Sequence, residues 1–203
     1  MKKNLFFVFI AASFALLISS PGRLAYGLPL IAELNLLYIG AAAFNLLVKK
    51  LDLGDLQEIL SLSFIVFAAL LFKQLLILYS PVIALALGFS IFLPAASAFL
   101  LGGVFYGSGS SVLGDANTPL FFSAFAFLFF LARDILGYGT ISLPIPNGIE
   151  EFVLFDSQST AFLSFFASIP GALLIFVFCA SFLLTLQTRM NVFEKAGVLD
   201  END

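Results

Sequence analysis

FFSAFAFLFFLA, residues 121–132, is the stretch that decides the fold of this chain. Its apolar side chains follow one another without the alternation of apolar and polar residues that a membrane β-strand shows over about ten residues. Hydrocarbon offers no water to the backbone, so a spanning segment must satisfy its own N–H and C=O groups, and a helix does so within one segment. The sequence therefore predicts a helix that crosses a lipid bilayer.

Five further apolar runs accompany this one. The six runs cover residues 4–20, 28–48, 59–79, 81–106, 118–137 and 159–188. Each reaches or approaches the roughly 17–25 residues that a helix needs to cross about 30 Å of hydrocarbon. Charged residues make up 11% of the chain, whereas soluble domains carry about 25%. We therefore expect one all-α, polytopic membrane domain over residues 1–203, with six transmembrane helices.

Basic residues predict the orientation of these crossings. The side that holds both termini carries Lys2, Lys3, Lys49, Lys50, Arg189 and Lys195. The opposite side carries Arg23 and, near the end of the fifth run, Arg133. By the positive-inside rule, both termini are expected to lie in the cytoplasm. We expect the chain to be a multi-pass protein of the inner (cytoplasmic) membrane. The first run is expected to be retained as a helix, because its signal-peptide cleavage pattern is poor. The outer segment at about 138–158 is expected to be a short ordered lid or docking surface.

Composition excludes several kinds of chemistry. His is absent and Cys179 is the only thiol, so the usual soft metal ligands are missing and no disulfide can form within the chain. Lys plus Arg is 9 against 13 acids, without a basic stripe, which argues against nucleic-acid binding. The Gly-rich segment 107–111 lacks the lysine of a phosphate-binding loop. We assign no catalytic residue and no metal ligand.

Two segments are expected to interrupt the helices. Pro94 lies in the middle of the fourth run and is followed by the small residues 95–98 (AASA). This pattern fits either a kinked, tightly packed helix or two half-helices at the bilayer midplane. The first run ends in Ser-Ser-Pro-Gly at 19–22. If the chain consists of two inverted three-helix halves, the broken helices one and four correspond.

Four ionisable residues fall at membrane depth, where a central charge costs at least about 2.5–3.5 kcal/mol. Glu33 is either a proton or cation ligand or a shallow hydrogen-bonded acid. Lys73 either joins Glu33 in an ion path or is an interfacial anchor whose long stem snorkels. On bare chemistry, Arg133 and Asp134 form a structural feature at a helix end.

Residues 132–143 (ARDILGYGTISL) resemble a signature of the integral membrane subunits of Rnf and Na⁺-translocating NADH:quinone reductase (Nqr) complexes, of the type called RnfE or NqrD. The match falls on Arg133, Asp134, Gly137, Gly139 and Thr140, with Asp where the family has Glu. A weaker match over residues 81–102 falls on Pro81, Gly88, Ser97, Ala98, Leu101 and Gly102. The resemblance spans most of the chain, and the 132–143 motif is its most specific part.

The resemblance implies a subunit of an ion-coupled electron-transport complex, packed against a sister six-helix subunit, with flavin and iron–sulfur clusters on its partners. In the family, Cys residues in the first and fourth helices hold an iron–sulfur cluster. Ala98 occupies the fourth-helix position, and Cys179 lies in the last run. We therefore expect no cofactor on this chain alone and a structural or ion-path-forming role. Whether the chain is an enzyme stays open, since it belongs by resemblance to an oxidoreductase complex but has no visible redox centre.

The residues leave two other functions open. The chain is alternatively a small-molecule transporter or the substrate-capture component of an uptake system, with Glu33 and the Gly-rich region 102–109 facing a ligand. Stabilisation by a small metabolite would favour this function. A pure assembly factor is the third possibility, and it predicts that alanine at Glu33, Lys73 and Arg133 leaves the activity of the complex unchanged.

Overall fold

The computed structural model describes residues 14–51, 56–106, 117–155, 163–181 and 185. This part of the chain is mostly helical. Three of its helices are long and apolar enough to cross a membrane, at Leu24–Val48, Ile59–Tyr79 and Pro81–Phe99, and a shorter apolar helix covers Ile169–Ser181. The chain thus has the helices of a membrane protein, with three candidate spans in the described residues where six were predicted. Most of the first run and the Gly-rich segment 107–111 lie outside these residues.

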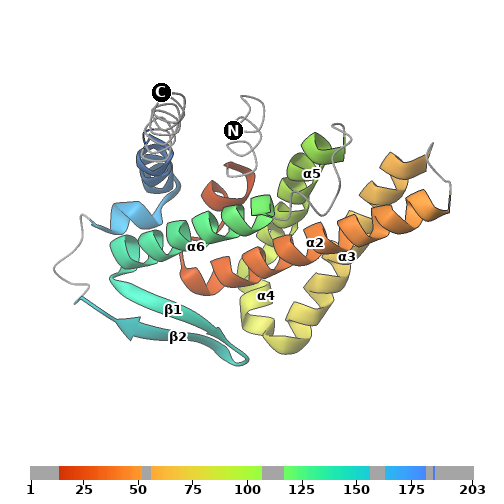
Figure 1. Ribbon diagram of the computed structural model, residues 1–203. Helices are drawn as coiled ribbons and strands as arrows, with labels where there is room; N and C mark the ends of the chain where they lie inside the picture. Colours follow the sequence, from red (N-terminus) through yellow and green to blue (C-terminus); the bar gives the residue numbers. More distant parts are fainter. Residues whose placement is uncertain (1–13, 52–55, 107–116, 156–162, 182–184, 186–203) are drawn as a thin grey trace, which may run out of the picture.

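Helices α2 (Leu24–Lys50) and α6 (Asn117–Tyr138) lie side by side and run in opposite directions (Figure 1). The Nδ2 atom of Asn35 donates a hydrogen bond to Ser123 Oγ at 2.8 Å. Closer to the start of α2, Gly27 lies against the ring of Phe130, which an added Cβ would meet at 2.4 Å. This pair of helices forms the centre of the molecule, and most of the fully buried phenylalanines lie on α6.

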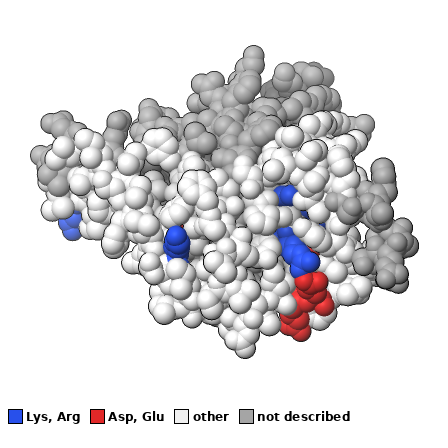
Figure 2. All heavy atoms as spheres, turned by 180° about the vertical axis from the view of Figure 1, so that it is seen from behind, with Lys and Arg blue, Asp and Glu red and all other residues white. Residues whose placement is uncertain are grey.

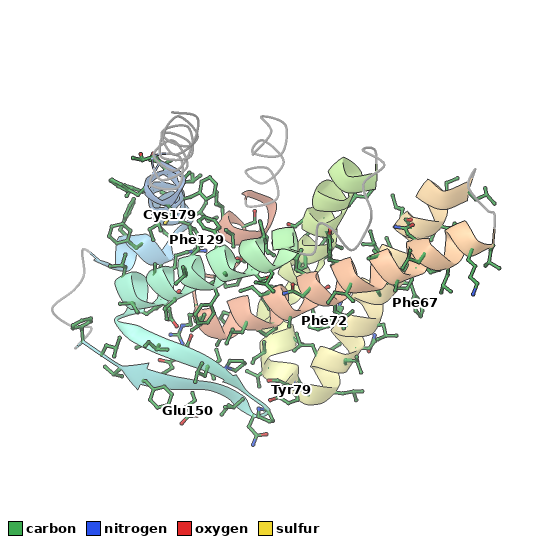
Figure 3. The ribbon with its side chains drawn as sticks, in the orientation of Figure 1. Phe67, Phe72, Tyr79, Phe129, Glu150 and Cys179 are labelled. Atoms are coloured by element: carbon green, nitrogen blue, oxygen red, sulfur yellow. The ribbon has the colours of Figure 1, made fainter. Side chains whose placement is uncertain are left out.

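Helix α3 (Gln57–Tyr79) returns antiparallel to the second half of α2. Ser61 Oγ donates a hydrogen bond to Asn45 Oδ1 at 2.5 Å, and the rings of Phe44 and Phe64 stack with centroids 4.7 Å apart. The rest of α3 presents a broad apolar surface that includes Ile59, Leu62, Val66, Phe67, Leu70 and Leu78 (Phe67 is labelled in Figure 3). Such a surface is suited to lipid or to another membrane subunit.

The fourth run is divided, but not where the proline predicted. Helix α4 (Pro81–Leu87) ends at Gly88, the 3₁₀ segment η3 (Gly88–Phe92) follows, and α5 (Leu93–Tyr106) continues. Gly88 has φ +52°, a conformation that costs glycine little and other residues more. Pro94 lies in the first turn of α5, where its missing N–H removes no helical hydrogen bond. The run is therefore interrupted by a 3₁₀ segment that begins six residues before Pro94, and Pro81–Phe99 together remains long and apolar enough for one crossing.

The purely all-α prediction was wrong at the segment after α6, where strands β1 (Thr140–Ile145) and β2 (Gly148–Val153) form an antiparallel hairpin. The register pairs Thr140 with Val153 and Ile145 with Gly148. The two-residue turn between Ile145 and Gly148 lets the facing backbone groups of the two strands pair with each other. Pro144 is tolerated in β1 because both strands of this sheet are edge strands, and Pro146 lies in the turn.

Two short helices complete the described chain. The π-helix η1 (Phe14–Ile18) precedes the Ser-Ser-Pro-Gly break and α2, and the 3₁₀ segment η5 (Leu163–Ala167) precedes the helix at Ile169–Ser181. The segment η5 lies near the end of α6 where the hairpin begins (Figure 1). The chain that follows η1 reaches this end through Ser20, whose carbonyl oxygen accepts a hydrogen bond from Arg133 on α6. Four segments distant in sequence therefore meet at one end of α6.

Candidate functional site

Arg133 lies inside this meeting point, with its side chain 1% exposed. Its Nη1 atom donates hydrogen bonds to the carbonyl oxygens of Leu17 and Ser20, each at 3.0 Å. Its Nη2 atom donates to the carbonyl oxygen of Ala167 at 3.0 Å. One guanidinium thus connects two segments that lie 147 residues apart (Ser20 to Ala167).

These carbonyls belong to helix ends. Leu17 is the second-last residue of η1, Ser20 follows two residues after the end of η1, and Ala167 is the last residue of η5. The last carbonyls of a helix have no partner within it and carry partial negative charge, so a buried cation with several donors stabilises them. The planar guanidinium offers five N–H donors in a fixed geometry, which a lysine ammonium does not. Arg133 therefore holds two interrupted segments against α6.

Asp134, the next residue, is also fully buried, but its hydrogen-bond partners differ from those of Arg133. Its Oδ2 atom accepts hydrogen bonds from the backbone N–H of Leu24 at 3.2 Å and from the backbone N–H of Ser142 at 2.7 Å. The Ser142 hydroxyl donates to the same oxygen at 2.5 Å, and Thr140 Oγ1 contacts Oδ1 at 3.4 Å. The carboxylate thus lies at the N-terminus of α2, where free N–H groups and the helix dipole favour a negative charge.

The two glycines of the motif permit this packing. At Gly137, an added Cβ would lie 2.7 Å from the backbone nitrogen of Ala167, which is closer than real Cβ contacts come. Gly139 has φ +67°; its N–H donates to the Ile135 carbonyl at 3.0 Å and its carbonyl accepts from the N–H groups of Leu154 and Phe155. It therefore ends α6 and starts the hairpin in a conformation that favours glycine.

All five residues of the 133–140 motif therefore contribute to one structure, which we call the α6 junction: Arg133, Asp134, Gly137, Gly139 and Thr140, together with the backbone that they bind. The sequence placed these residues at a helix end but did not identify their partners. Ser142, whose hydroxyl also accepts a hydrogen bond from the Ala25 N–H at 3.0 Å, was missed. The sequence offered little to identify Ser142, because a single serine in a strand can have many different roles.

A charged group lies beside the junction at the surface. Arg23 forms an ion pair with Glu151 on β2, and its guanidinium carbon lies 4.6 Å from the centroid of the Tyr138 ring. Partial burial lowers the pKa of Arg23, but the hydrogen bond and charge of Glu151 outweigh it and leave this pKa above its ordinary value. Figure 2 shows basic and acidic side chains side by side at one edge of an otherwise almost uncharged face. This is the charged end that a membrane-embedded bundle would expose to water or headgroups.

Glu33, on α2, lies apart from the α6 junction. Its side chain is 0% exposed, and neither carboxyl oxygen has a hydrogen-bond partner in the described part of the chain. Lys73 on α3, its suggested companion, is half-buried with Nζ 5.2 Å from the centroid of the Phe92 ring. No ion pair within 4 Å joins these two side chains. The structure therefore does not bring Glu33 and Lys73 together as one charged pair.

The residues at the family's cluster position do not fit an iron–sulfur cluster. Ala98 on α5 is 3% exposed and belongs to the hydrophobic core, and its methyl group offers no ligand atom. Cys179 lies on the helix Ile169–Ser181 and is half-buried against the core (Figure 3).

No protein-family model, curated protein or solved structure matches the chain.

Proposed function

We propose that this chain is a divergent integral membrane subunit of an Rnf/Nqr-like, ion-coupled electron-transport complex, with a structural or ion-path-forming role. The observation that carries the proposal is the α6 junction. The residues through which the sequence resembles that family are the residues that hold η1, α2, the hairpin and η5 together. Because all five motif residues take part in one junction, the motif supports the family resemblance more strongly than it would if these residues lay apart on the surface.

The geometry of the α6 junction favours a structural role over a catalytic one. Arg133 donates its hydrogen bonds to backbone carbonyls, and Asp134 accepts hydrogen bonds from N–H and hydroxyl groups. Arg133 Nε has no hydrogen-bond partner in the described chain, but it is buried like the rest of both side chains, so neither presents a polar atom to a surface that a reactant could reach. The core packing of Ala98 points the same way, because it replaces the sulfur donor of the family with a methyl group.

In the proposed membrane arrangement, six helices cross the inner membrane and both termini lie in the cytoplasm. The three candidate spans account for the second, third and fourth crossings. The first run, α6 and the segment containing Ile169–Ser181 supply the other three. The hairpin with Glu150 and Glu151 then lies on the outer side, where its charges meet water. If the chain consists of two inverted three-helix halves, the first and the fourth crossings correspond.

We further propose that the partners are other membrane subunits, foremost a sister six-helix subunit, and that they carry the flavin and iron–sulfur groups. The exposed apolar surface of α3 supports a neighbour in the membrane, either lipid or protein. The chain itself would complete the scaffold or part of the ion path.

Affinity purification of the tagged chain in a mild detergent tests the proposal, with iron and flavin measured in the complex and in the chain alone. We expect co-purified subunits that carry flavin and iron–sulfur groups. A preparation from cells that express the tag on an unrelated six-helix protein is the control. A stable solitary monomer would contradict complex membership, and iron retained by the isolated chain would overturn the assignment of Ala98.

A further inference from the structure

Glu33 lies on a defined face of α2. Gly27 and Asn35 contact α6, as described above, whereas Gly40 and Phe44 contact the Phe64 ring on α3. Glu33 precedes Gly40 by seven residues and Phe44 by eleven, which places it on the same helical stripe as these two. Its carboxyl group is therefore turned away from α6 and toward the side of α2 on which Gly40 and Phe44 meet α3.

This carboxyl group has no polar compensation within the described structure. Both oxygens are buried without a hydrogen-bond partner there, whereas Asp134, also fully buried, accepts hydrogen bonds from Leu24 and Ser142. The α6 junction lies near the start of α2, nine residues before Glu33, or about 13 Å along the helix axis. Its donors are therefore too far away to serve Glu33.

The charged groups on the elements packed against α2 do not neutralise Glu33 either. On α6, Arg133 and Asp134 belong to the α6 junction. On α3, Lys73 is held over the Phe92 ring and forms no ion pair with Glu33. The described side chains of α4, η3, α5 and β1 include no acidic or basic group. At the ends of α2, Arg23 pairs with Glu151 and Lys50 lies 17 residues away.

An ionised carboxylate in this position would lose its hydration without gaining a partner, at a cost so high that buried acids normally take up a proton instead. A metal cation would need several oxygen ligands, and the described residues contain no group of three His, Cys, Asp or Glu side chains that could hold one. The geometry therefore suits a proton and not a metal ion.

We propose that Glu33 is a proton-binding site inside the helical bundle, which takes up and releases a proton without a metal ion. The inference deepens the proposed ion-path role and rests on it for its biological meaning. In this proposal the ion bound at Glu33 is a proton, and Lys73 is not part of the binding site.

Carbodiimide labelling of the full chain in native membrane vesicles tests this site. Dicyclohexylcarbodiimide is hydrophobic and forms a stable adduct with a protonated carboxyl group in apolar surroundings. We expect peptide mass spectrometry to find this adduct on Glu33, to find less of it as the pH is raised, and to find none in Glu33→Gln. A water-soluble carbodiimide is the matched probe, and it should modify the exposed Glu150 and spare Glu33. Glu150→Gln should leave the Glu33 adduct unchanged.

Each other outcome overturns the proposal. Absence of the adduct on Glu33, or an adduct that does not respond to pH, would mean that this group does not exchange a proton. Protection by Na⁺ at constant pH, with choline as the control cation, would make the site a cation ligand. Neither result depends on partner subunits. If the chain is labelled at Glu33 but purifies alone, the proton site stands and the proposed function is contradicted. If the chain purifies with partner subunits but is not labelled at Glu33, the proposed function stands and the proton site is contradicted.

Discussion

The Oδ2 atom of Asp134 accepts two hydrogen bonds from Ser142, one from its backbone N–H at 2.7 Å and one from its hydroxyl at 2.5 Å. The same hydroxyl accepts a hydrogen bond from the N–H of Ala25, the second residue of α2. The first N–H groups of α2 are therefore satisfied from α6 and β1, more than a hundred residues later in the chain. This relationship explains why a helix with no acidic residue in its own first turn begins where it does.

Replacing Asp134 should therefore cost more than replacing Ser142. Asp134→Ala leaves two buried backbone N–H groups and one hydroxyl without their acceptor, and we expect the free energy of unfolding to fall by about 3 kcal/mol or more. Ser142→Ala removes the charge-assisted bond to Asp134 and the acceptor of the Ala25 N–H, but it leaves the two backbone N–H bonds to Asp134 in place, so it should cost about 1.5–3 kcal/mol. Thermal unfolding in detergent, combined in a double-mutant cycle, measures both. If the losses of unfolding free energy in the two single variants simply add up in the double variant, the side chains of Asp134 and Ser142 do not interact directly.

Arg133→Lys should destabilise the chain although it conserves the charge. The ammonium group cannot reach the carbonyls of Leu17, Ser20 and Ala167 together, so at least one buried carbonyl loses its donor, at about 1–3 kcal/mol. Arg23→Lys is the matched control, because that guanidinium is partly exposed and its ion pair with Glu151 contributes about 0–1 kcal/mol. Equal melting temperatures for the two variants would show that Arg133 does not connect these segments.

Gly137→Ala and Gly40→Ala separate backbone contact from side-chain contact. At Gly137 the new methyl group would meet the backbone of Ala167 at 2.7 Å, which can yield only if η5 moves. At Gly40 it would meet the edge of the Phe64 ring at 3.1 Å, which can rotate. We expect Gly137→Ala to lower stability by about 1–3 kcal/mol and Gly40→Ala to change it little. Limited proteolysis should detect release of the segment around η5 in the first variant alone.

Glu33→Leu should stabilise the chain, because it replaces a buried carboxyl group that lacks hydrogen-bond partners with an apolar side chain. The expected gain is about 1–3 kcal/mol, read as a higher melting temperature in detergent. Glu33→Gln is the control, since the amide retains the unpaired polar atoms and should change stability little. A lower melting temperature for Glu33→Leu would mean that the carboxyl group has a structural partner.

Impermeant thiol labelling of intact cells checks the proposed orientation. In a Cys179→Ala background, we expect the variant Glu150→Cys to react from outside, because the proposed topology places the hairpin on the outer face. Lys50→Cys should react only after the cells are permeabilised, since the end of α2 is expected in the cytoplasm. The reversed pattern would invert the topology.

Several structural features followed from sequence reasoning because they depend on local chemistry. The apolar runs at 28–48 and 59–79 correspond closely to α2 and α3, since a long apolar segment has few alternatives to a helix. The hairpin and the break at Gly88 were not predicted. The strands of the hairpin are only six residues long, Pro144 lies in β1, and Pro146 lies in the turn. At Gly88 the sequence gives a weaker sign of a helix break than a proline would.

By itself, the sequence determined that this protein is a helical, lipid-compatible chain with a few costly ionisable residues, because run length and composition act locally and need no partner. Only the tertiary structure decided what those residues do. The guanidinium of Arg133 meets carbonyls 116, 113 and 34 positions away, while Glu33 meets no hydrogen-bonding group among the described residues. Burial makes a charge costly on both side chains. Arg133 has hydrogen-bond partners from other segments and so holds the fold together, whereas Glu33 has none among the described residues and is a candidate proton site.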